Sequence, residues 1–269
     1  MILDQRYRVL KLKLAFKIQY KGTNYSGFQS QKNANSIQDE LIRAFKQISI
    51  DNLQMNYSGR TDKGVHALGQ VFDVVVSQDR SDMQWINGLN SNLPNDISVV
   101  EVDRVEDTFH SRFDAIDRTY SYLIFNSPSR NVLLEDFYYW EQSDLDVDKM
   151  NEESQCLFGK HNFTSFRSLS CGSNNPERNI KKIEINKLGN IIEIKITANA
   201  FLQNMVRIIV GTLLEIGKDQ IKISLKQILE SRDRNNAGIT INPRGLIFLG
   251  PNYENITKLN PEKSPLIRI

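Results

Sequence analysis

The stretch from Leu10 to Tyr20 alternates apolar and mostly polar side chains, with an apolar residue at every second position. This period of two matches one face of a strand, so the stretch predicts a half-buried strand early in the fold. A loop rich in Gly, Asn and Ser follows. Ser36 then begins a segment whose apolar residues repeat at helical spacing as far as Ile48, which predicts a helix with Ser36 as its N-cap.

Strands and helices keep alternating along the rest of the chain. In the first half we expect a strand over 70–76, a short helix over 82–90 and a strand over 95–102, which completes the order β-α-β-α-β. In the second half the expected elements are a strand over 118–125, a helix over 146–159, a hairpin over 180–197 with its turn at Gly189 and Asn190, helices over 201–217 and 225–232, and a strand over 245–249.

This order divides the chain into two similar α/β halves, residues 1–108 and residues 109–269. Each half mixes hairpins with helices, which predicts an α+β fold with mixed, largely antiparallel sheets. No segment has the biased composition of a linker, so we expect the halves to pack closely. A cleft between them is the natural place for a site.

Charge and cysteine content narrow the class of protein only slightly. The chain carries 34 Lys and Arg against 32 Asp and Glu, a balance too even to indicate nucleic-acid binding by itself. One basic run near the start consists of Arg6, Arg8, Lys11, Lys13, Lys17 and Lys21. The two cysteines lack metal spacing and fit a reducing compartment, and no stretch resembles a signal peptide or a membrane span. We therefore expect a cytoplasmic protein.

Most cofactor chemistries lack their usual motifs in this chain. His66, His110 and His161 are far apart in sequence, so we expect each to be structural and no metal to bind. The phosphate-binding motif GxxxxGK[ST], the dinucleotide-binding motif GxGxxG and the esterase motif GxSxG do not occur. Nucleotide hydrolysis, dinucleotide redox chemistry and serine esterase chemistry are therefore disfavoured, and we expect no cofactor.

A polar loop, YSGRTDKGVHALGQ at residues 57–70, offers an acid with basic neighbours. Asp62 lies close to Arg60 and Lys63, and either cation would favour its ionised form if it turned toward the carboxylate. An ionised carboxylate acts as a nucleophile or a general base without a cofactor. The simpler interpretation is a polar turn, in which glycine supplies unusual backbone angles and the charges point into water.

Arg207 is unusual for its surroundings, because it is the only charged residue between Phe201 and Leu214. Burying a guanidinium without a partner is very costly, so it must either extend along its stem to solvent or reach an anion. A carboxylate or a phosphate in the cleft would meet that need. Asp62 is one candidate, although the sequence does not show that the two side chains meet.

Tyr120 lies near the start of a predicted strand, shortly after Arg112 and Arg118. It is either an ordinary strand aromatic or a stacking surface for a planar ligand, with basic groups nearby for phosphate. The second combination is typical of RNA-binding proteins.

Several sequence blocks resemble one family. GRTDKGVHA is similar to the signature loop of tRNA pseudouridine synthases of the anticodon-stem class, the TruA family. The blocks YKGTNYSGFQSQ, SIQDEL, LNSNLPNDI, FHSRFDAIDRTYSY, GKHNFTSFR, NAFLQNMVRIIVG and AGITINPRGLIFL resemble other blocks of this family, in the family's order. Together they cover nearly the whole chain, from about Lys11 to Leu249. Many members carry Trp where this chain has Phe28, a change that keeps an aromatic ring.

The resemblance implies a fold, a reaction and a set of roles. The fold is two α/β halves around a deep basic cleft, in a homodimer that binds tRNA. The reaction is the isomerisation of uridine to pseudouridine at tRNA positions 38, 39 and 40, without cofactor or metal. The matching residues are Asp62 for the catalytic aspartate, Tyr120 for the tyrosine that stacks on the flipped target base, Arg207 for the arginine that pairs with the aspartate, and Arg60 for the arginine that displaces the target nucleotide.

Asp62 would then be the nucleophile. It would attack C6 of uracil or C1′ of the ribose, or instead remove a ribose proton toward a glycal; the sequence leaves these routes open. The residues expected to contact phosphates are the early lysines, Arg112, Arg118 and Arg178.

Two other functions compete with the isomerase. One is a non-catalytic RNA-binding module that uses the same cleft. The other is an aspartyl-nucleophile phosphatase, which would need a metal-binding acid two residues after Asp62, where this chain has Gly64.

Overall fold

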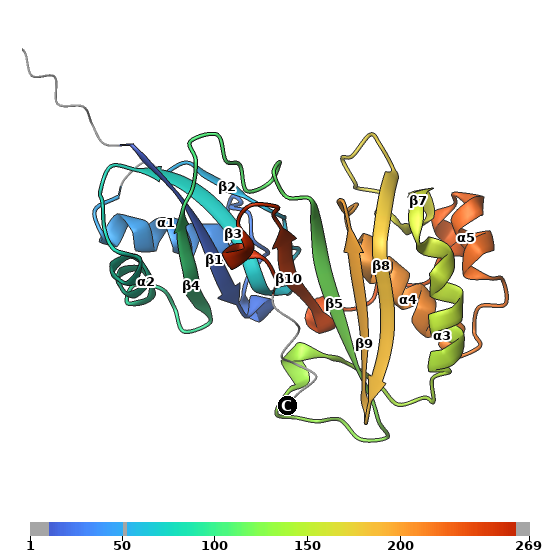
Figure 1. The fold of residues 1–269 in the computed structure, drawn as a ribbon. Coiled ribbons are helices and arrows are strands. Elements are labelled where there is room, and N and C mark those ends of the chain that lie inside the picture. The colour runs from blue at the N-terminus through green and yellow to red at the C-terminus, as the bar shows by residue number, and fades with distance from the viewer. Residues whose placement is uncertain (1–10, 51–52, 262–269) are drawn as a thin grey trace, which may run out of the picture.

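The computed structural model describes residues 11–50 and 53–261, and these residues form one mixed sheet of ten strands (Figure 1). Along the main path the strand order is β4-β1-β3-β10-β5-β9-β8-β7, with β2 paired to β3 and β6 paired to β5. The strands are β1 (Leu12–Tyr20), β2 (Met55–Tyr57), β3 (His66–Val76), β4 (Ile97–Arg104), β5 (Asp117–Asn126), β6 (Tyr139–Glu141), β7 (Gly159–Asn162), β8 (Glu177–Leu188), β9 (Ile191–Ala198) and β10 (Leu246–Asn252). Only the pairs β3–β10 and β5–β6 are parallel among the described strands, which confirms the largely antiparallel sheet.

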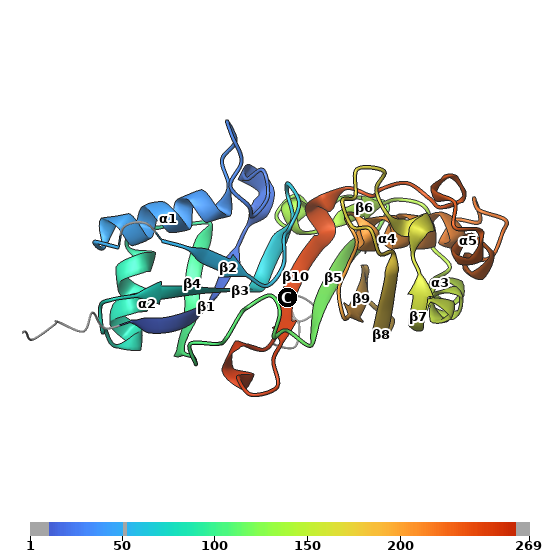
Figure 2. The ribbon, with the colours of Figure 1, turned by 90° about the horizontal axis from the view of Figure 1, so that it is seen from above.

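The helices lie in two groups, one at each end of the sheet (Figures 1 and 2). α1 (Ile37–Gln47) and α2 (Asp82–Asn90) lie at the end that contains β1 and β4. α3 (Val147–Ser154), α4 (Met205–Gly217) and α5 (Leu225–Ser231) lie at the end that contains β7, β8 and β9. This arrangement is the mixed α/β architecture predicted from the sequence.

The N-terminal core forms because the even-numbered side chains of β1 all point toward α1 and α2. Leu14, Phe16 and Ile18 are buried there, and the ring of Phe16 stacks on that of Phe72 at 5.1 Å. The side chain of Ser36 accepts a hydrogen bond from the backbone N–H of Asp39, as expected for the N-cap of α1. The predicted strand and helix are therefore both confirmed.

The C-terminal core lies between α4 and the long hairpin β8–β9. The turn of this hairpin is at Gly189, whose φ of 57° is the left-handed conformation that glycine tolerates best. Ile194 and Ile196 of β9 pack in the same buried cluster as Ile208 and Ile209 of α4. Nearly every side chain of α4 is buried, because its sequence is apolar on all faces.

β10 joins the two ends of the sheet. It pairs in parallel with β3 and antiparallel with β5, so a strand from the end of the chain lies in the middle of the sheet. Phe248 belongs to the N-terminal core and Leu246 to the C-terminal core. The sequence predicted the strand, but its central position depends on pairing between residues that are more than a hundred positions apart.

Some boundaries differ from those predicted. β3 begins at His66, four residues before the expected start, because its first residues pair with β10. α4 begins at Met205 and not at Phe201, since Asn204 has a φ of 60° that is incompatible with continuing the helix backwards. The short strands β2, β6 and β7 were not predicted.

The connection between β4 and β5 contains residue 108, where the sequence places the division between the two halves. Among the helices of the described residues, none is long and apolar enough to cross a bilayer.

Candidate active site

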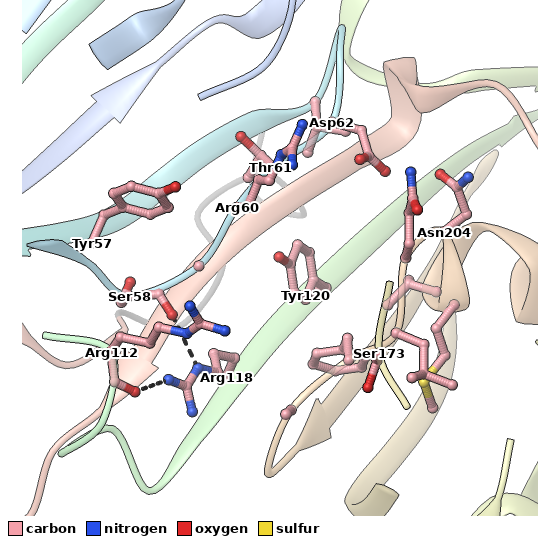
Figure 3. A pocket seen from close by; sticks show the side chains of 18 of the residues that line it. Tyr57, Ser58, Arg60, Thr61, Asp62, Arg112, Arg118, Tyr120, Ser173 and Asn204 are labelled. Atoms are coloured by element: carbon pink, nitrogen blue, oxygen red, sulfur yellow. Dashed lines mark hydrogen bonds between the residues drawn. The ribbon is translucent and has the colours of Figure 1, made fainter. Parts of the chain in front are cut away.

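A pocket of about 740 Å³ lies between the two ends of the molecule (Figure 3). Its walls come mainly from the loop between β2 and β3, the loop before β5, β5 itself and residues 200–207 at the start of α4. Four further residues complete the lining, namely Gln29, Gly172, Ser173 and Leu246. All four residues that the resemblance singles out line it, namely Arg60, Asp62, Tyr120 and Arg207. The structure therefore brings together side chains that are up to 147 positions apart, 207 minus 60.

The loop that carries Asp62 is fixed through its neighbour Thr61, which is buried. The carbonyl of Thr61 accepts from the backbone N–H of Phe28 at 3.2 Å, and its hydroxyl bonds with the phenol of Tyr20 at 2.7 Å. Gly64 then reverses the chain with a φ of 77°. With residue 61 held and residue 64 turned back, the side chain of Asp62 points into the pocket (Figure 3).

The start of the loop is held by Gln70, which is fully buried on β3. Its side-chain amide donates to the carbonyl of Gly59 at 2.5 Å, and its side-chain oxygen accepts from the hydroxyl of Ser58 at 2.7 Å. A β-carbon at position 59 would be 3.4 Å from the Phe248 ring. The polar-turn interpretation is thus correct for the backbone, but Asp62 does not point into bulk water.

Arg207 lies in the first turn of α4 and reaches the same space. Its Nη1 is 3.9 Å from Oδ2 of Asp62, an ion pair without a direct hydrogen bond. The guanidinium is held in place by Nε, which donates to the carbonyl of Ile241 at 2.8 Å, and by Nη1, which donates to the side chain of Asn204 at 2.9 Å. Of the two alternatives left open for Arg207, the structure shows the one in which it reaches a carboxylate in the cleft.

Two opposing effects act on the Asp62 carboxylate. Burial raises its pKa above the ordinary value, while the guanidinium groups of Arg207 and Arg60 lower it, and burial is the larger effect. The expectation that the cations would simply favour the ionised form is therefore incomplete. The two arginines reduce the free-energy cost of keeping the Asp62 carboxylate charged when its side chain is only 33% exposed.

Tyr120 extends from β5 into the middle of the pocket, with Asp62 and Asn204 above it in the view of Figure 3. Its ring packs edge-on against Phe201 at 5.0 Å and, tilted by 32°, against Phe248 at 4.8 Å. Burial raises the pKa of its phenol well above 10, so the hydroxyl stays neutral. The ring is fixed on one side of the pocket and can present a flat surface to a planar ligand.

Arg60, the residue before Thr61, is exposed and lines the pocket. Arg112 is also exposed and lines it from the loop before β5. Among the residues that the structure describes, Asp62 is the only acid that lines the pocket, beside four arginines. The pocket is therefore basic around a single carboxylate.

Arg118, for which the sequence predicts a phosphate contact, lines the pocket and is also hydrogen-bonded within the protein. Its guanidinium donates to the backbone carbonyls of Ser58 at 3.2 Å, of Ala115 and Asn199 at 3.0 Å each, and of Arg112 (Figure 3). Burial lowers its pKa. Arg118 connects the Asp62 loop, the loop before β5 and the end of β9.

Arg178, another predicted phosphate contact, is also hydrogen-bonded within the protein. It does not line the pocket, and its guanidinium donates to the carbonyl of Asn175 at 2.9 Å and to the hydroxyl of Ser173 at 3.1 Å. Ser173 lines the pocket, so Arg178 supports its wall from behind.

The early basic run is also used within the protein. Lys13 pairs with Asp73 at 3.5 Å, Lys17 is buried and donates to the carbonyl of Asn260, and Lys21 pairs with Asp136 at 2.5 Å. Lys13 and Lys17 share the face of β1 on which residues 253–260 lie, which explains why they do not form an exposed stripe. Arg6 and Arg8 lie outside the described residues.

The three histidines are each hydrogen-bonded within the chain. His66 accepts from the N–H of Gly22 through Nδ1 and donates through Nε2 to the carbonyl of Asp136, which fixes the neutral tautomer. His110 and His161 bond to nearby backbone groups. Within residues 11–50 and 53–261, no three His, Cys, Asp or Glu side chains come together in the way that a metal site needs.

Sequence reasoning missed part of the pocket wall. Asn204 was placed inside the helix, although Asn directly before an apolar helix is a common N-cap residue and could have signalled the helix start. Gly172 and Ser173 come from a loop whose sequence gives no such signal. Phe113, an exposed aromatic at the pocket, was not singled out either.

Comparison with known proteins shows which family this chain is similar to. A family model described as tRNA pseudouridine synthase matches residues 17–114 and 154–254. A tRNA pseudouridine synthase A of Hydrogenovibrio crunogenus is 42% identical over 241 residues, 89% of this chain and 92% of that relative. One of Francisella tularensis is 41% identical over 238 residues, 88% of this chain and 92% of the relative.

A solved structure of an H/ACA RNP bound to a substrate RNA containing 2′-deoxyuridine is similar over 75% of this chain and 53% of that one. With 9% identity and a TM-score of 0.32, it supports no inference. The family model covers most of the chain, and the relatives align over nearly their whole length. This chain belongs to the tRNA pseudouridine synthase family.

Proposed function

We propose that this protein isomerises uridine to pseudouridine at positions 38, 39 and 40 of the tRNA anticodon stem-loop. Membership of the family makes it an isomerase that acts on uridine in tRNA. One observation carries the assignment of the site: a single carboxylate, Asp62, lies in a basic pocket within ion-pair distance of Arg207 and shares that pocket with Tyr120.

The reaction breaks the N1–C1′ bond of uridine, turns the uracil and forms a bond between C5 and C1′, with loss of the C5 proton. Asp62 is the nucleophile in this proposal. Attack on C6, attack on C1′ and removal of a ribose proton toward a glycal all require the ionised carboxylate. The pocket suits this requirement because Arg207 and Arg60 favour the charge that burial disfavours.

Tyr120, Arg60 and Arg207 take the supporting roles. A base inside a helix cannot reach Asp62, so the target nucleotide must be flipped out, at a cost of a few kcal/mol. Arg60, exposed on the loop that carries Asp62, takes the place of the flipped nucleotide. Tyr120 stacks on the uracil, and Arg207 keeps Asp62 charged and oriented.

The test is Asp62→Asn, which keeps the size of the side chain and removes the charge. With tRNA tritiated at C5 of uridine, we expect tritium release to fall to background, while tRNA binding stays close to that of wild type. Mapping pseudouridine in the product should show positions 38, 39 and 40 modified by wild type and unmodified by the variant. Release at the wild-type rate would remove Asp62 from the mechanism.

The same experiment distinguishes the competing RNA-binding module. That function predicts tight, salt-sensitive tRNA binding by the wild-type protein with no new pseudouridine. The ion pair between Asp62 and Arg207 argues against it, because a binding surface for phosphates gains nothing from a carboxylate at its centre.

We propose further that the enzyme is a cytoplasmic homodimer, as the resemblance to the anticodon-stem class implies. Sedimentation at several protein concentrations measures the mass in solution, and a fluorescent fusion reports the location. A monomer at all concentrations would contradict the homodimer, and fluorescence outside the cytoplasm would contradict the cytoplasmic location.

A further inference from the structure

Phe113 is an exposed aromatic residue at the pocket that contains Asp62. Its side chain is 73% exposed, yet it lines the pocket together with Arg112. Single exposed apolar residues are common on protein surfaces and need no explanation alone. The loop around Phe113, however, is held far more firmly than an ordinary surface loop.

Buried polar contacts fix this loop from below. The N–H of Ser111 donates to Oδ1 of Asp73 at 2.8 Å, and the carbonyl of Ser111 accepts from the phenol of Tyr253 at 2.6 Å. Ser111, Asp73 and Tyr253 are all almost completely buried. The next carbonyl, that of Arg112, accepts from the guanidinium of Arg118. The backbone on either side of Phe113 is thus anchored to the core.

Contacts within the loop fix its turn. The N–H groups of Phe113 and Asp114 both donate to the carbonyl of His110, at 3.1 Å and 3.0 Å. The carboxylate of Asp114 accepts from the N–H of His110 at 2.8 Å, so this acid is used within the loop. The structure therefore holds the backbone of Phe113 in place, so only its side chain remains to be ordered when a ligand binds.

The groups beside the ring suit a nucleotide. The guanidinium carbon of Arg112 lies over the Phe113 ring, 5.7 Å from its centre, and the centre of the His110 ring is 4.3 Å away with the two rings tilted by 46°. We call Arg112 and Phe113 the rim platform. An aromatic ring with a cation close to it fits a base with its phosphate. The acid of the same loop, Asp114, is already bonded to the N–H of His110.

We propose that the rim platform binds an unpaired nucleotide next to the target uridine, with Phe113 stacked on its base and Arg112 on its phosphate. This proposal rests on the proposed function. Flipping the target uridine removes a stacking partner from its neighbours. The Phe113 ring at the pocket replaces that partner, and so offsets part of the cost of flipping.

The experiment compares Phe113→Ala, Phe113→Trp and the control Leu133→Ala in the full chain. Leu133 is 92% exposed and lies outside the pocket. The probes are an anticodon stem-loop RNA labelled for anisotropy and the same RNA tritiated at C5. We expect Phe113→Ala to weaken binding about 5- to 150-fold with unchanged Tm, and Leu133→Ala to change neither.

Two readouts separate stacking from a merely structural role. Phe113→Trp should bind RNA with wild-type affinity, because Trp also stacks. RNA should also quench the fluorescence of the Trp side chain introduced in this variant, measured as the difference from the wild type, which already contains Trp85 and Trp140. Arg112→Gln should make the plot of log K for RNA binding against log salt less steep, by about one unit of slope, as expected for one lost phosphate contact.

The outcomes distinguish the two proposals. If wild type releases no tritium, the proposed function fails. If wild type is active and Phe113→Ala binds RNA as tightly as wild type, only the rim platform is overturned. A Phe113→Ala variant that binds RNA normally but changes from dimer to monomer would show that the ring contacts a second copy of this chain, which also overturns the proposal.

Discussion

At the scale of single residues, Asp62 is under two opposing demands. Catalysis requires a charged carboxylate, but burial raises its pKa and so makes the charged form costly. Arg207 is the main opposing group, at 3.9 Å, although much of its guanidinium is bonded to Ile241 and Asn204. The site thus keeps a destabilising charge because that charge is needed for the reaction.

This conflict predicts that Asp62→Asn does not lower stability. A carboxyl whose pKa is higher in the folded than in the unfolded state binds protons more tightly when folded, so its contribution to stability falls as pH rises. At neutral pH the wild-type charge is therefore a cost that Asn lacks. We expect a thermal melt at pH 7 to give a Tm at least equal to that of wild type. A clear drop in Tm would mean that the ion pair with Arg207 stabilises the fold.

Arg207 should control the pH dependence of the reaction. Replacing it by Gln removes the cation that lowers the pKa of Asp62, while burial continues to raise it. The variant carboxylate therefore needs a higher pH to ionise, so the acid limb of kcat/KM should move to higher pH. Rates of tritium release measured across pH give the limb directly, and an unchanged limb would show that another group sets it.

At the scale of elements, the loop over 57–65 positions Asp62 in two ways, by hydrogen bonds before Asp62 and by a backbone turn after it. Hydrogen bonds from Tyr20, Phe28 and Gln70 hold the loop before Asp62, and the left-handed Gly64 turns the chain after it. The loop is therefore a rigid support whose geometry is set by neighbouring elements.

Gly64→Ala tests this support. A β-carbon at position 64 would lie 3.1 Å from the Pro243 side chain, and the φ of 77° disfavours any residue but glycine. We expect a loss of about 1–2 kcal/mol in the free energy of unfolding. Because small displacements of a reacting group are costly, kcat should fall by up to about 100-fold.

The matched control is Gly189→Ala, in the β8–β9 turn. Gly189 also has a positive φ, 57°, but a β-carbon there would meet nothing within 4 Å. Denaturant unfolding should show that it, too, loses stability, whereas its kcat should equal that of wild type. Equal effects of both substitutions on kcat would show that the loss in Gly64→Ala reflects stability alone.

At the scale of the whole molecule, β10 makes one sheet out of two ends. We propose that residues 1–108 and 109–269 are functional halves, the first carrying Asp62 and the second Tyr120 and Arg207. The pocket lies between them, so its geometry depends on how they are joined. Phe248 and Leu246 on β10 pack into the two different cores, which couples the halves.

This coupling predicts a single unfolding transition. Trp85 is buried in the N-terminal core. Trp140 lies on β6, which pairs with β5, and packs against a cluster that contains residues of β5 and β10, so it reports on the junction. Trp140→Phe leaves only Trp85 as a fluorescent reporter, and Trp85→Phe leaves only Trp140. The thermal melts of the two variants should have the same midpoint once the loss of stability caused by each substitution is subtracted. Phe248→Ala should lower the stability seen by both reporters by about 3–5 kcal/mol. Separate midpoints for the two reporters would contradict the coupling.

The local elements followed from the sequence because their signals are local. The alternation in β1, the cap at Ser36, the turn at Gly189 and the apolar run of α4 each depend on residues within about one element, so near-neighbour spacing is enough to predict them. The candidate residues of the site were also found, three of them as charged or aromatic side chains unusual for their position, and Arg60 through its place in the signature loop.

What the sequence left open was where those elements and side chains meet. Only the tertiary structure placed β10 between β3 and β5, put Arg207 against Asp62, bound Arg118 to four backbone carbonyls and covered Lys17 with residues 253–260. The reason is physical: these contacts join residues far apart in the chain, and the burial that shifts the pKa of Asp62 exists only once both ends of the sheet have closed around it.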